Sequence, residues 1–482
     1  MRNERPARTG TTAHLVESIP KGLEDLRGTP NVQYTEDVLV RLTDAATKTL
    51  DVTAMYWNLL PDPSGPDERG FTDMQFQKMG AGTGRMLFDA LRHAAARGVR
   101  IRILESPGFS TPTDGTGPAA PPTVTESHQL HDEYPDQVTV HQVQMGDWYG
   151  GAGIMHQKIW IFDRRHLYIG SANMDWKSIE QVKEMGIAVE GSPALAKDAT
   201  TYFEGWCRFA DEQPTTADVF DPAARVTRTV PSWSELVPES ARTRTPIHAP
   251  ASSSIDDPMK LTMDGERAGV FLTGCPPEVR GEGRTYDGDG LVHTIHDARR
   301  SVCVSVMDFA PFGLYGRDRS RPSPIEGGEE IPTDTPVWWP SLVDALLAAV
   351  LTRKAHVRLL VSSWAHTSDF VEPGLRAIQA AADAGRAGKY TSTGQLEVKQ
   401  FIVPGWDDTS GKWRTFPGHS RVNHTKYIVT DRRANIGTSN MTWDYFTSTA
   451  GSSFNTDHTR IVADLQAVFD RDWASPYAWR LT

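Results

Sequence analysis

The stretch that decides the fold reads His156-Gln-Lys158-Ile-Trp-Ile-Phe-Asp163, followed after six residues by Gly170-Ser-Ala-Asn173. Positions 159–162 form an apolar, β-prone run, and side chains two positions apart on a strand leave the same face. We therefore expect His156 and Lys158 to point into the same space, where an imidazole and an ammonium would lie together.

A second copy of this pattern lies far downstream. It reads His424-Thr-Lys426, then Asp431, then Gly437-Thr-Ser-Asn440, again around an apolar run at 427–429. A single His-x-Lys is most often a solvated strand face or a satisfied core histidine. Six residue types repeated in the same order are hard to obtain by chance. Two copies predict two halves that share one site.

The order of expected secondary structure also repeats around the two copies. Hydrophobic periodicity predicts helix, strand, helix and strand at 36–49, 50–57, 86–97 and 99–104, and the same order at 291–300, 302–309, 342–353 and 357–362. Strand, helix, strand indicates a parallel α/β layer. The sequence therefore predicts an α/β protein built from two duplicated halves.

These patterns divide the chain into four segments. We expect a disordered leader at 1–13, an N-terminal half at 14–212, an inter-half connection at 213–260 and a C-terminal half at 261–482. The connection is rich in Pro, Ser, Thr and Ala, which is typical of a long linker or surface excursion.

Composition limits the classes of function that remain. The 482 residues carry a net charge of −11, which argues against a generally basic nucleic-acid-binding surface but not against one basic cleft. The three cysteines, Cys207, Cys275 and Cys303, give neither a disulfide framework nor metal-ligand spacing. No apolar h-region follows the N-terminus and no transmembrane segment is present, so we expect a cytoplasmic protein without an obligate protein partner.

The two motifs resemble the signature of the phospholipase D superfamily: His-x-Lys, four residues, Asp, six residues, Gly-Ser-x-Asn. The first copy matches fully, whereas the second has five residues before the glycine and Thr438 in the serine position. The flanking stretches 15–20, 170–176, 181–184 and 423–430 look like the animal lysosomal phospholipase-D-like 5′ exonucleases and related poxvirus proteins. This resemblance implies mixed or parallel sheets, a pseudo-two-fold axis between the halves, and an active site at their interface.

The resemblance also implies a mechanism. One imidazole attacks phosphorus to form a phosphohistidine, and the other protonates the leaving oxygen and then activates water. The usual order in the superfamily assigns the nucleophile to His156 and the general acid/base to His424. Four side chains would hold the phosphoryl oxygens: Lys158, Lys426, Asn173 and Asn440. This scheme requires no metal and no cofactor.

A carboxylate downstream of the first motif completes the expected catalytic set. In the superfamily such a carboxylate orients an active-site imidazole, and Glu184 stands in the matching position. The second half departs from the pattern, because Ser448 stands where the animal relatives carry glutamate. We expect one histidine to be less polarised, unless Asp444 substitutes.

Five further motif residues are expected to play supporting roles. Asp163 and Asp431 lie at or past the strand ends, where they are expected to brace the fold through ion pairs. The hydroxyl residues of the two glycine-containing segments complete this group: Ser171, Thr438 and Ser439.

The substrate class stays open on the sequence alone. The leading hypothesis is a 5′ exonuclease on single-stranded DNA or RNA, with Trp338, Trp339 and Tyr315 as candidate base-stacking residues. Its candidate basic residues are Arg100, Arg102, Lys177, Arg358 and Arg421. A phospholipase D or transphosphatidylase acting on glycerophospholipid is the second hypothesis, although no basic amphipathic segment stands out. The third is a catalytically weak nucleic-acid-binding or scaffold protein.

Overall fold

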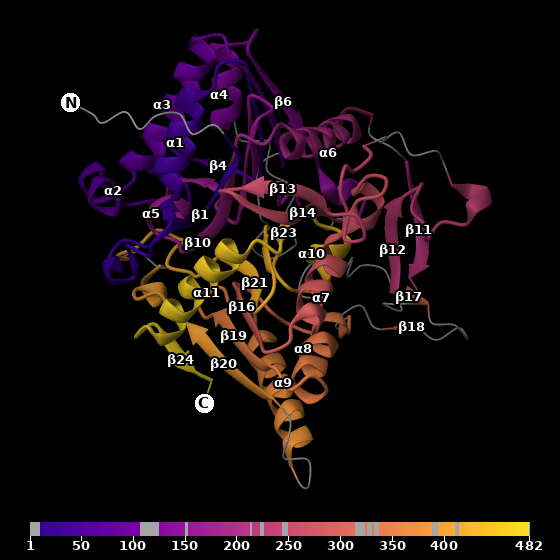
Figure 1. The fold of residues 1–482 in the computed structure, drawn as a ribbon. Helices are drawn as coiled ribbons and strands as arrows, with labels where there is room; N and C mark the ends of the chain where they lie inside the picture. Colours follow the sequence, from indigo (N-terminus) through magenta and orange to yellow (C-terminus); the bar gives the residue numbers. More distant parts are fainter. Residues whose placement is uncertain are drawn as a thin grey trace.

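The computed structural model describes residues 10–106, 125–149, 153–212, 215–221, 226–242, 249–313, 323–324, 330–331, 337–387, 394–409 and 414–481. Figure 1 shows two α/β halves, the first in the upper part of the view and the second in the lower part. Each half contains one large mixed sheet with helices packed against it. This arrangement confirms the predicted α/β architecture with two halves.

The first half is built on an eight-stranded sheet with the order β2-β1-β10-β8-β7-β3-β5-β6. Its strands are β1 (Thr12–Ser18), β2 (Val32–Tyr34), β3 (Thr49–Ala54), β5 (Arg100–Glu105), β6 (Val138–Gln142), β7 (Ile159–Phe162), β8 (His166–Gly170) and β10 (Glu184–Glu190). Its helices are α1 (Thr35–Ala45), α2 (Asp73–Met79), α3 (Gly82–Ala96), α4 (Glu126–Glu133), α5 (Trp176–Glu180) and α6 (Pro193–Glu212). Two short strands, β4 (Trp57–Asn58) and β9 (Met174–Asp175), pair separately.

The second half is built on a larger sheet with the order β13-β14-β23-β22-β21-β16-β19-β20-β24. Its strands are β13 (Met259–Met263), β14 (Glu266–Gly274), β15 (Thr285–Tyr286), β16 (Ser301–Val306), β19 (His356–Ser362), β20 (Gln395–Phe401), β21 (Lys426–Thr430), β22 (Ala434–Gly437), β23 (Ser453–Thr456) and β24 (Ala478–Arg480). Its helices are α7 (Asp287–Asp297), α8 (Ser341–Leu351), α9 (Val371–Arg386), α10 (Trp443–Thr447) and α11 (Thr459–Ala474).

The two sheets repeat one another strand by strand. The run β10-β8-β7-β3-β5-β6 of the first sheet corresponds to β23-β22-β21-β16-β19-β20 of the second. In both runs the last three strands are parallel, because a helix connects each of these strands to the next. The repeated order of elements read from the sequence is therefore confirmed as a structural duplication.

Equivalent helix ends show how different residues meet the same backbone requirement. After α3 the chain turns through Gly98 with a φ of 87°, and after α8 it turns through Lys354 with a φ of 61°. Glycine adopts this left-handed conformation freely, whereas a residue with a Cβ is strained by about 1 kcal/mol or more. Burial of α8 against the sheet, with Leu346 and Val350 fully enclosed, offsets that cost.

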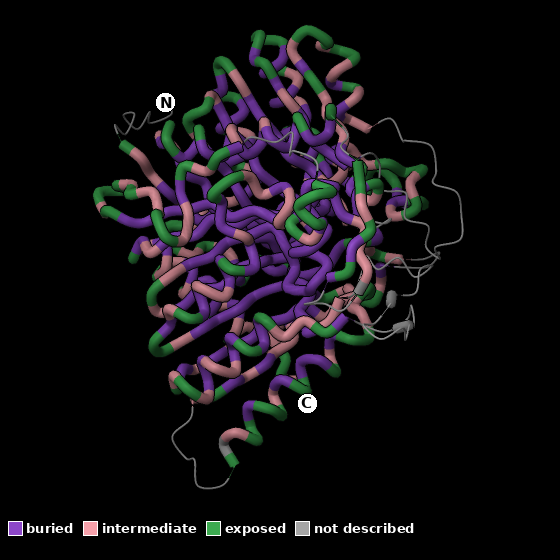
Figure 2. The backbone as a smooth tube through the Cα atoms, turned by 90° about the vertical axis from the view of Figure 1, so that its right-hand side faces the viewer, coloured by how far each residue is buried: buried purple, intermediate pink, exposed green. Residues whose placement is uncertain are grey.

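Each half contributes its last long helix to the interface with the other half. Asp198 on α6 forms a fully buried ion pair of 3.0 Å with Arg284 of the second half. Asp472 on α11 forms a second buried pair, of 2.8 Å, with Lys183 of the first half. One apolar core runs through both halves, and Figure 2 shows the buried backbone that surrounds it. The side chains between the two halves are therefore buried like those inside a single domain.

The ends of the segments differ in detail from the prediction. The expected leader is too long, because positions 12 and 13 belong to β1 and pair with β10. The connection contains a hairpin of β11 (Thr216–Asp221) and β12 (Val226–Pro231), and Trp233 joins it to the body by donating to the carbonyl of Glu278 at 2.7 Å. No helix in the described ranges has both the length and the apolar character needed to cross a bilayer.

One further two-stranded ribbon and five 3-10 turns complete the secondary structure of the described residues. The ribbon pairs β17 (Ser323–Pro324) with β18 (Glu330–Ile331). The 3-10 turns lie at Glu24–Leu26, Met145–Asp147, Glu239–Ala241, Pro277–Val279 and Trp406–Asp408.

Candidate active site

The two His-x-Lys motifs meet at the junction of the halves. The backbone N–H of His156 donates to the carbonyl of Ala450 at 3.0 Å, and that of His424 donates to Lys183 at 2.8 Å. Each motif is therefore attached to the strand of the opposite half, in two equivalent places. The two imidazole rings lie 6.2 Å apart between their centroids. This geometry is that of a pseudo-two-fold site with one histidine from each half.

Each motif lysine is hydrogen-bonded to the backbone of the histidine two residues before it, in the same way in both halves. The Nζ of Lys158 donates to the carbonyl of His156 at 2.9 Å, and the Nζ of Lys426 donates to the carbonyl of His424 at 2.6 Å. Only 1% of the surface of each lysine is exposed. Two buried lysine side chains next to one another suit an anion, because an anion would stabilise their protonated forms.

Burial dominates the protonation of this site. It lowers the pKa of His424 to about 4, although Glu184 acts in the opposite direction. Burial, with the charges of Lys158 and Lys426, holds the pKa of His156 well below its ordinary value, against a smaller effect of the Thr438 backbone. Burial also lowers the pKa of Lys426 to about 7 and that of Lys158 well below its ordinary value. Burial therefore disfavours the imidazolium form of both histidines, and Glu184 opposes this effect at His424.

The two asparagines of the motifs are oriented by different partners. The Nδ2 of Asn173 donates to the hydroxyl of Tyr56 at 3.5 Å, whereas the Nδ2 of Asn440 donates to Asp308 at 3.2 Å. Among the described residues, neither asparagine Oδ1 has a hydrogen-bond partner. Tyr56 and Asp308 stand two residues beyond β3 and β16, so they are equivalent positions of the duplication.

Asp308 is a functional candidate that the sequence analysis missed. Its carboxyl group is 1% exposed, and burial raises its pKa to about 7, with Lys426 acting in the opposite direction. Asp175 is a second missed carboxylate, which accepts the hydroxyl proton of Tyr56 at 2.7 Å. Aligning the two repeats beyond the strand ends would have placed Tyr56 opposite Asp308 and could have drawn attention to both.

Glu184 lies where the sequence predicted it, against one histidine only. Both carboxylate oxygens lie 2.9 Å from Nδ1 of His424, and Ser171 donates its hydroxyl to Glu184 at 2.5 Å. Strand pairing identifies the equivalent position of the second half as Gly451. Among the described residues, Nδ1 of His156 has no hydrogen-bond partner. The site is thus symmetric in its histidines and lysines and asymmetric in its carboxylate.

The similarity of this chain to known proteins extends over both halves. Two family models match, "Cardiolipin synthase, PLD-like domain" at residues 71–206 and "PLD3/4, PLD-like domain" at residues 249–406. The chain is 31% identical to the Xenopus laevis 5'-3' exonuclease PLD3 over 472 residues, which are 96% of this chain and 80% of that protein. The chain belongs to the phospholipase D superfamily.

Other members of the superfamily carry different names. The human 5'-3' exonuclease PLD3 is 31% identical over 99% of this chain and 82% of its own length. The Caenorhabditis elegans protein named "Probable phospholipase D F09G2.8" is 32% identical over 96% of this chain and 70% of its length. A phosphatidylserine synthase structure from Haemophilus influenzae has a TM-score of 0.52 at 9% identity, covering 93% of this chain and 86% of that chain, and so supports the fold alone.

Ser448 does not take over the role of a second glutamate in this superfamily member. Its hydroxyl donates to the backbone carbonyl of Asp444 at 3.0 Å, at the end of α10. The nearest described aromatic ring to His156 is that of Tyr445, with centroids 5.0 Å apart and the rings nearly perpendicular. His156 is therefore positioned by packing and by its backbone.

The hydroxyl residues of the second motif have structural contacts. Thr438 accepts a hydrogen bond from the backbone N–H of Ser452 at 3.0 Å, just as Ser171 accepts one from Met185. The hydroxyl of Ser439 lies 3.9 Å from the sulfur of Cys275. These contacts fix the strand turns that present the asparagines.

The two motif aspartates have structural roles, mainly through the backbone and not through ion pairs as expected. Asp163 accepts the backbone N–H groups of residues 47, 48 and 49 at 2.7–3.0 Å. Asp431 accepts those of residues 299, 300 and 301 at 3.0–3.3 Å, and only a loose 3.5 Å ion pair joins it to Arg300. Backbone donors at these turns would otherwise lack partners. Both aspartates therefore secure the helix-to-strand turn beside their motif.

Two of the aromatic residues predicted to stack on bases lie in the described part of the chain, and one of them is exposed while the other is enclosed. Trp338 is 55% exposed, with its ring 5.4 Å from that of Phe312. Trp339 instead stacks on the buried ring of Phe446 at 5.1 Å, so it is less suited to stack on a base. Tyr315 lies outside the described residues.

Several predicted basic residues are engaged inside the protein. Arg102 and Arg358 form ion pairs of 2.7 Å with Asp51 and Asp470. Arg421 is buried and donates to backbone carbonyls. These three residues therefore support the fold and do not form a basic track for a polyanion.

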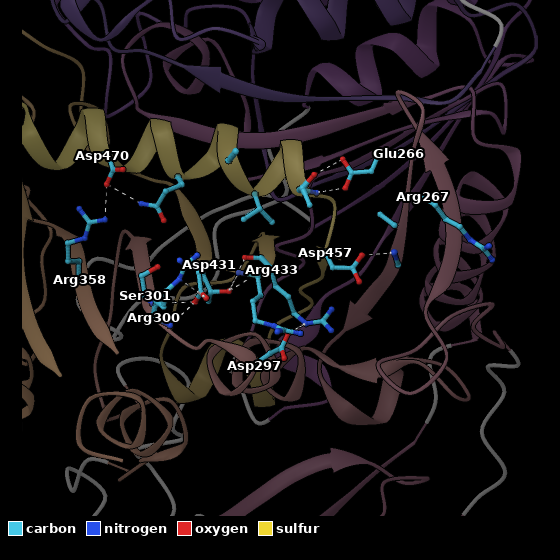
Figure 3. Close-up of a pocket in the computed structure, with 18 of the residues that line it drawn as sticks. Glu266, Arg267, Asp297, Arg300, Ser301, Arg358, Asp431, Arg433, Asp457 and Asp470 are labelled. Carbon is cyan, nitrogen blue, oxygen red and sulfur yellow. Dashed lines mark hydrogen bonds and ion pairs between the residues drawn. The ribbon is translucent and has the colours of Figure 1, made fainter. Parts of the chain in front are cut away.

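A hollow of about 890 Å³ lies away from this chemistry. Figure 3 shows that Asp431 and Arg300 line it, so it lies at the end of β21 opposite to His424. Its acidic and basic side chains largely neutralise one another, as in the 2.7 Å pair of Arg433 with Asp297. The volume of this hollow therefore does not identify it as the substrate site.

Proposed function

We propose that this phosphodiesterase is a 5′-to-3′ exonuclease that acts on single-stranded DNA or RNA. The observation that carries the proposal is full-length similarity to relatives named 5'-3' exonuclease PLD3, which extends over 96% and 99% of this chain. The complete pair of His, Lys and Asn side chains, buried together at the junction of the halves, supports it, because these groups can hold and cleave one phosphodiester.

In the first step the scissile phosphate lies among the two lysines and the two asparagine amides. The neutral imidazole of His156 attacks phosphorus, and the bond to the 5′ oxygen of the next nucleotide breaks. His424, which takes up a proton from solvent as the anionic phosphate binds, donates that proton to the oxygen as it leaves. The products are a phosphohistidine that carries the first nucleoside through its 3′ oxygen and a chain shortened by one nucleotide with a 5′ hydroxyl.

In the second step water enters at the same phosphorus. His424, now neutral, removes a proton from the water as the oxygen attacks, and the bond from phosphorus to His156 breaks. A nucleoside 3′-monophosphate is released and both imidazoles return to their initial states. Lys158 and Lys426 stabilise the phosphoryl oxygens in both steps.

The asymmetry of the site supports this assignment of roles. A nucleophile must be unprotonated, and burial together with the two lysines keeps His156 neutral. A general acid must carry a proton, and Glu184 stabilises the imidazolium form of His424 from 2.9 Å. The carboxylate therefore belongs with the acid/base, in agreement with the order implied by the superfamily.

Hydrolysis or exchange of a glycerophospholipid head group is the alternative function. The observation that favours it is similarity to proteins named phospholipase D, from Caenorhabditis elegans at 32% identity and from Dictyostelium discoideum at 29%. The same covalent intermediate would serve, with water or an alcohol in the second step. The two functions differ in the substrate that must bind next to the catalytic residues. An assay with both substrates distinguishes them.

The test uses a single-stranded oligonucleotide with a 5′ hydroxyl and a label at its 3′ end, beside vesicles of phosphatidylcholine and phosphatidylglycerol, with EDTA in every reaction. We expect stepwise loss of 5′ nucleotides, abolished in His156→Ala and His424→Ala. Head-group release with an intact oligonucleotide would transfer the protein to the lipid alternative. Inactivity on both substrates would overturn the assignment as an active enzyme.

A further inference from the structure

A pair of stacked histidines lies beside the apolar cluster that borders the catalytic strands, outside the machinery described above. The rings of His366 and His419 are nearly parallel, with an angle of 9° and centroids 4.4 Å apart. The ring of Trp364 lies 4.8 Å from the first and 6.2 Å from the second. Both histidines are exposed, so their free edges are available to a ligand.

The pair is close to the reacting groups. Trp364 packs with an apolar cluster of Val182, Met307 and Val422. These three residues stand two positions before Glu184, one before Asp308 and two before His424, so the cluster borders the catalytic strands. Since His419 stands five positions before His424, the Cα atoms of the two residues can be at most ~18 Å apart.

A chain of polar contacts joins the pair to the opposite side of the site. The Nδ1 of His419 lies 2.9 Å from Asp67, whose carboxylate also accepts from Lys177 at 3.2 Å. Lys177 lies 3.6 Å from Asp175, which accepts the hydroxyl proton of Tyr56 beside Asn173. The histidine pair therefore connects the second half to the first.

The contacts of the pair leave one side of each ring free. Asp67 holds Nδ1 of His419, whereas the other ring nitrogen, Nε2, has no hydrogen-bond partner among the described residues. Among the described residues, the His366 ring contacts the rings of Trp364 and His419, and Asp67 acts on it electrostatically. Two imidazoles side by side can each donate one N–H to an oxygen of the same anion, and they attract that anion when protonated.

We propose that His366 and His419 form a subsite for the phosphodiester that follows the scissile one in a single-stranded nucleic acid. The inference rests on the proposed exonuclease function and names the part of the substrate that the histidine pair binds. It favours a polynucleotide over a phospholipid, because a lipid with one phosphodiester has no second phosphate to place there.

Binding at this subsite takes up protons. The charged groups around the pair are Asp67, Lys177 and Arg414, the last of which donates to the carbonyl of the residue before Asp67 at 2.8 Å. Burial, then the neighbouring His419, lowers the pKa of His366. A bound phosphate opposes both effects, so the subsite is strongest at mildly acidic pH and weakens as pH rises past the histidine range.

The experiment compares a dinucleoside monophosphate with a trinucleoside diphosphate that has the same 5′ end. The shorter substrate contains the scissile phosphate only, and the longer one adds the second phosphate. The quantity measured is the ratio of kcat/KM for the longer substrate to that for the shorter, between pH 5 and pH 8, at several salt concentrations. His93→Ala, an exposed histidine on α3, is the matched control.

The parent enzyme should show a ratio above one that declines as pH rises. His366→Ala and His419→Ala should each lower the ratio at pH 5 about tenfold, the effect of one charge-assisted hydrogen bond, through KM and not kcat. The salt dependence for the longer substrate should become shallower by about 0.7 for each phosphate that the variant no longer neutralises. His366→Lys should keep the ratio and remove its pH dependence.

Three results would overturn the subsite. The first is an unchanged ratio in both alanine variants, and the second is a ratio in His366→Phe equal to that of the parent, which would indicate base stacking without charge. The third is no cleavage of either nucleotide substrate by the parent, which would also refute the exonuclease function. The first two leave that function intact, so the two proposals fail in distinguishable ways.

Discussion

Replacing Glu184 by glutamine removes one charge from the site and keeps its shape. Glu184 is fully buried, lies 2.9 Å from Nδ1 of His424 and accepts the hydroxyl proton of Ser171 at 2.5 Å. A glutamine can accept both hydrogen bonds through its amide oxygen. The variant therefore isolates the effect of the carboxylate charge on the imidazole.

The magnitude follows from the distance. Two unit charges 2.9 Å apart attract by about 6 kcal/mol at an effective dielectric constant of about 20. The amide dipole of glutamine retains part of this attraction, so the imidazolium should lose about 3–6 kcal/mol, which is about 10²–10⁴ in rate. Because Glu184 raises the pKa of His424 against burial, its loss must lower that pKa below its value of about 4. The pH profile should therefore shift to lower pH.

The assay is kcat/KM on a dinucleoside monophosphate from pH 4 to pH 8, with the unfolding midpoint measured on the same preparations. Glu190→Gln on the same strand is the control, because Glu190 is partly exposed and pairs with Arg41 at 2.7 Å, away from the histidines. Removing a buried charge while its hydrogen bonds survive should change the stability of Glu184→Gln little. A loss below tenfold with an unchanged pH profile would refute the assignment of Glu184 to His424.

Three further predictions concern other parts of the molecule. Asp308→Asn should move the alkaline limb of the pH–activity profile below pH 7. Burial lowers the pKa of Lys426 to about 7 and Asp308 acts in the opposite direction, so loss of the carboxylate lowers that pKa further. An alkaline limb that does not move would contradict this prediction. Lys183→Met should lower the free energy of unfolding, measured with denaturant, by about 3–5 kcal/mol, and the double variant Lys183→Met with Asp472→Leu should recover most of that loss. Equal losses in the single and double variants would exclude the buried ion pair as the cause. Denaturation without acid during turnover should trap a nucleoside 3′-phosphoryl group on His156, as read by mass spectrometry, and the same group on His424 would reverse the proposed roles.

The sequence was sufficient for the parts of the fold that depend on local pattern. The motif strands, the repeated order of helices and strands, and the meeting of His156 with His424 followed from hydrophobic periodicity and duplication. Glu184 could be placed by resemblance, because its position relative to the first motif is fixed along the chain. In each case the prediction depends on local pattern, duplication or a fixed spacing along the chain, and not on the register of paired strands.

Features that depend on strand pairing could not be read in the same way. Gly451 occupies the place of Glu184 because of the register of β22 with β23, whereas the resemblance along the sequence drew attention to Ser448. Asp308 gains its significance from burial and from contact with Asn440, which is 132 positions away. Periodicity predicts that such residues are buried but does not predict their partners.

The unequal carboxylates explain how a duplicated site can divide two chemical roles. With identical halves, both imidazoles would have the same proton affinity, and neither would be selected as nucleophile or acid. Here Glu184 stabilises the proton of His424, while His156 has the two lysines nearby and, among the described residues, no carboxylate at Nδ1. On the proposed mechanism the carboxylate therefore selects His424, and not His156, as the imidazole that holds the proton when the anionic phosphate binds. A duplication that lost one carboxylate would gain this assignment without any change in backbone.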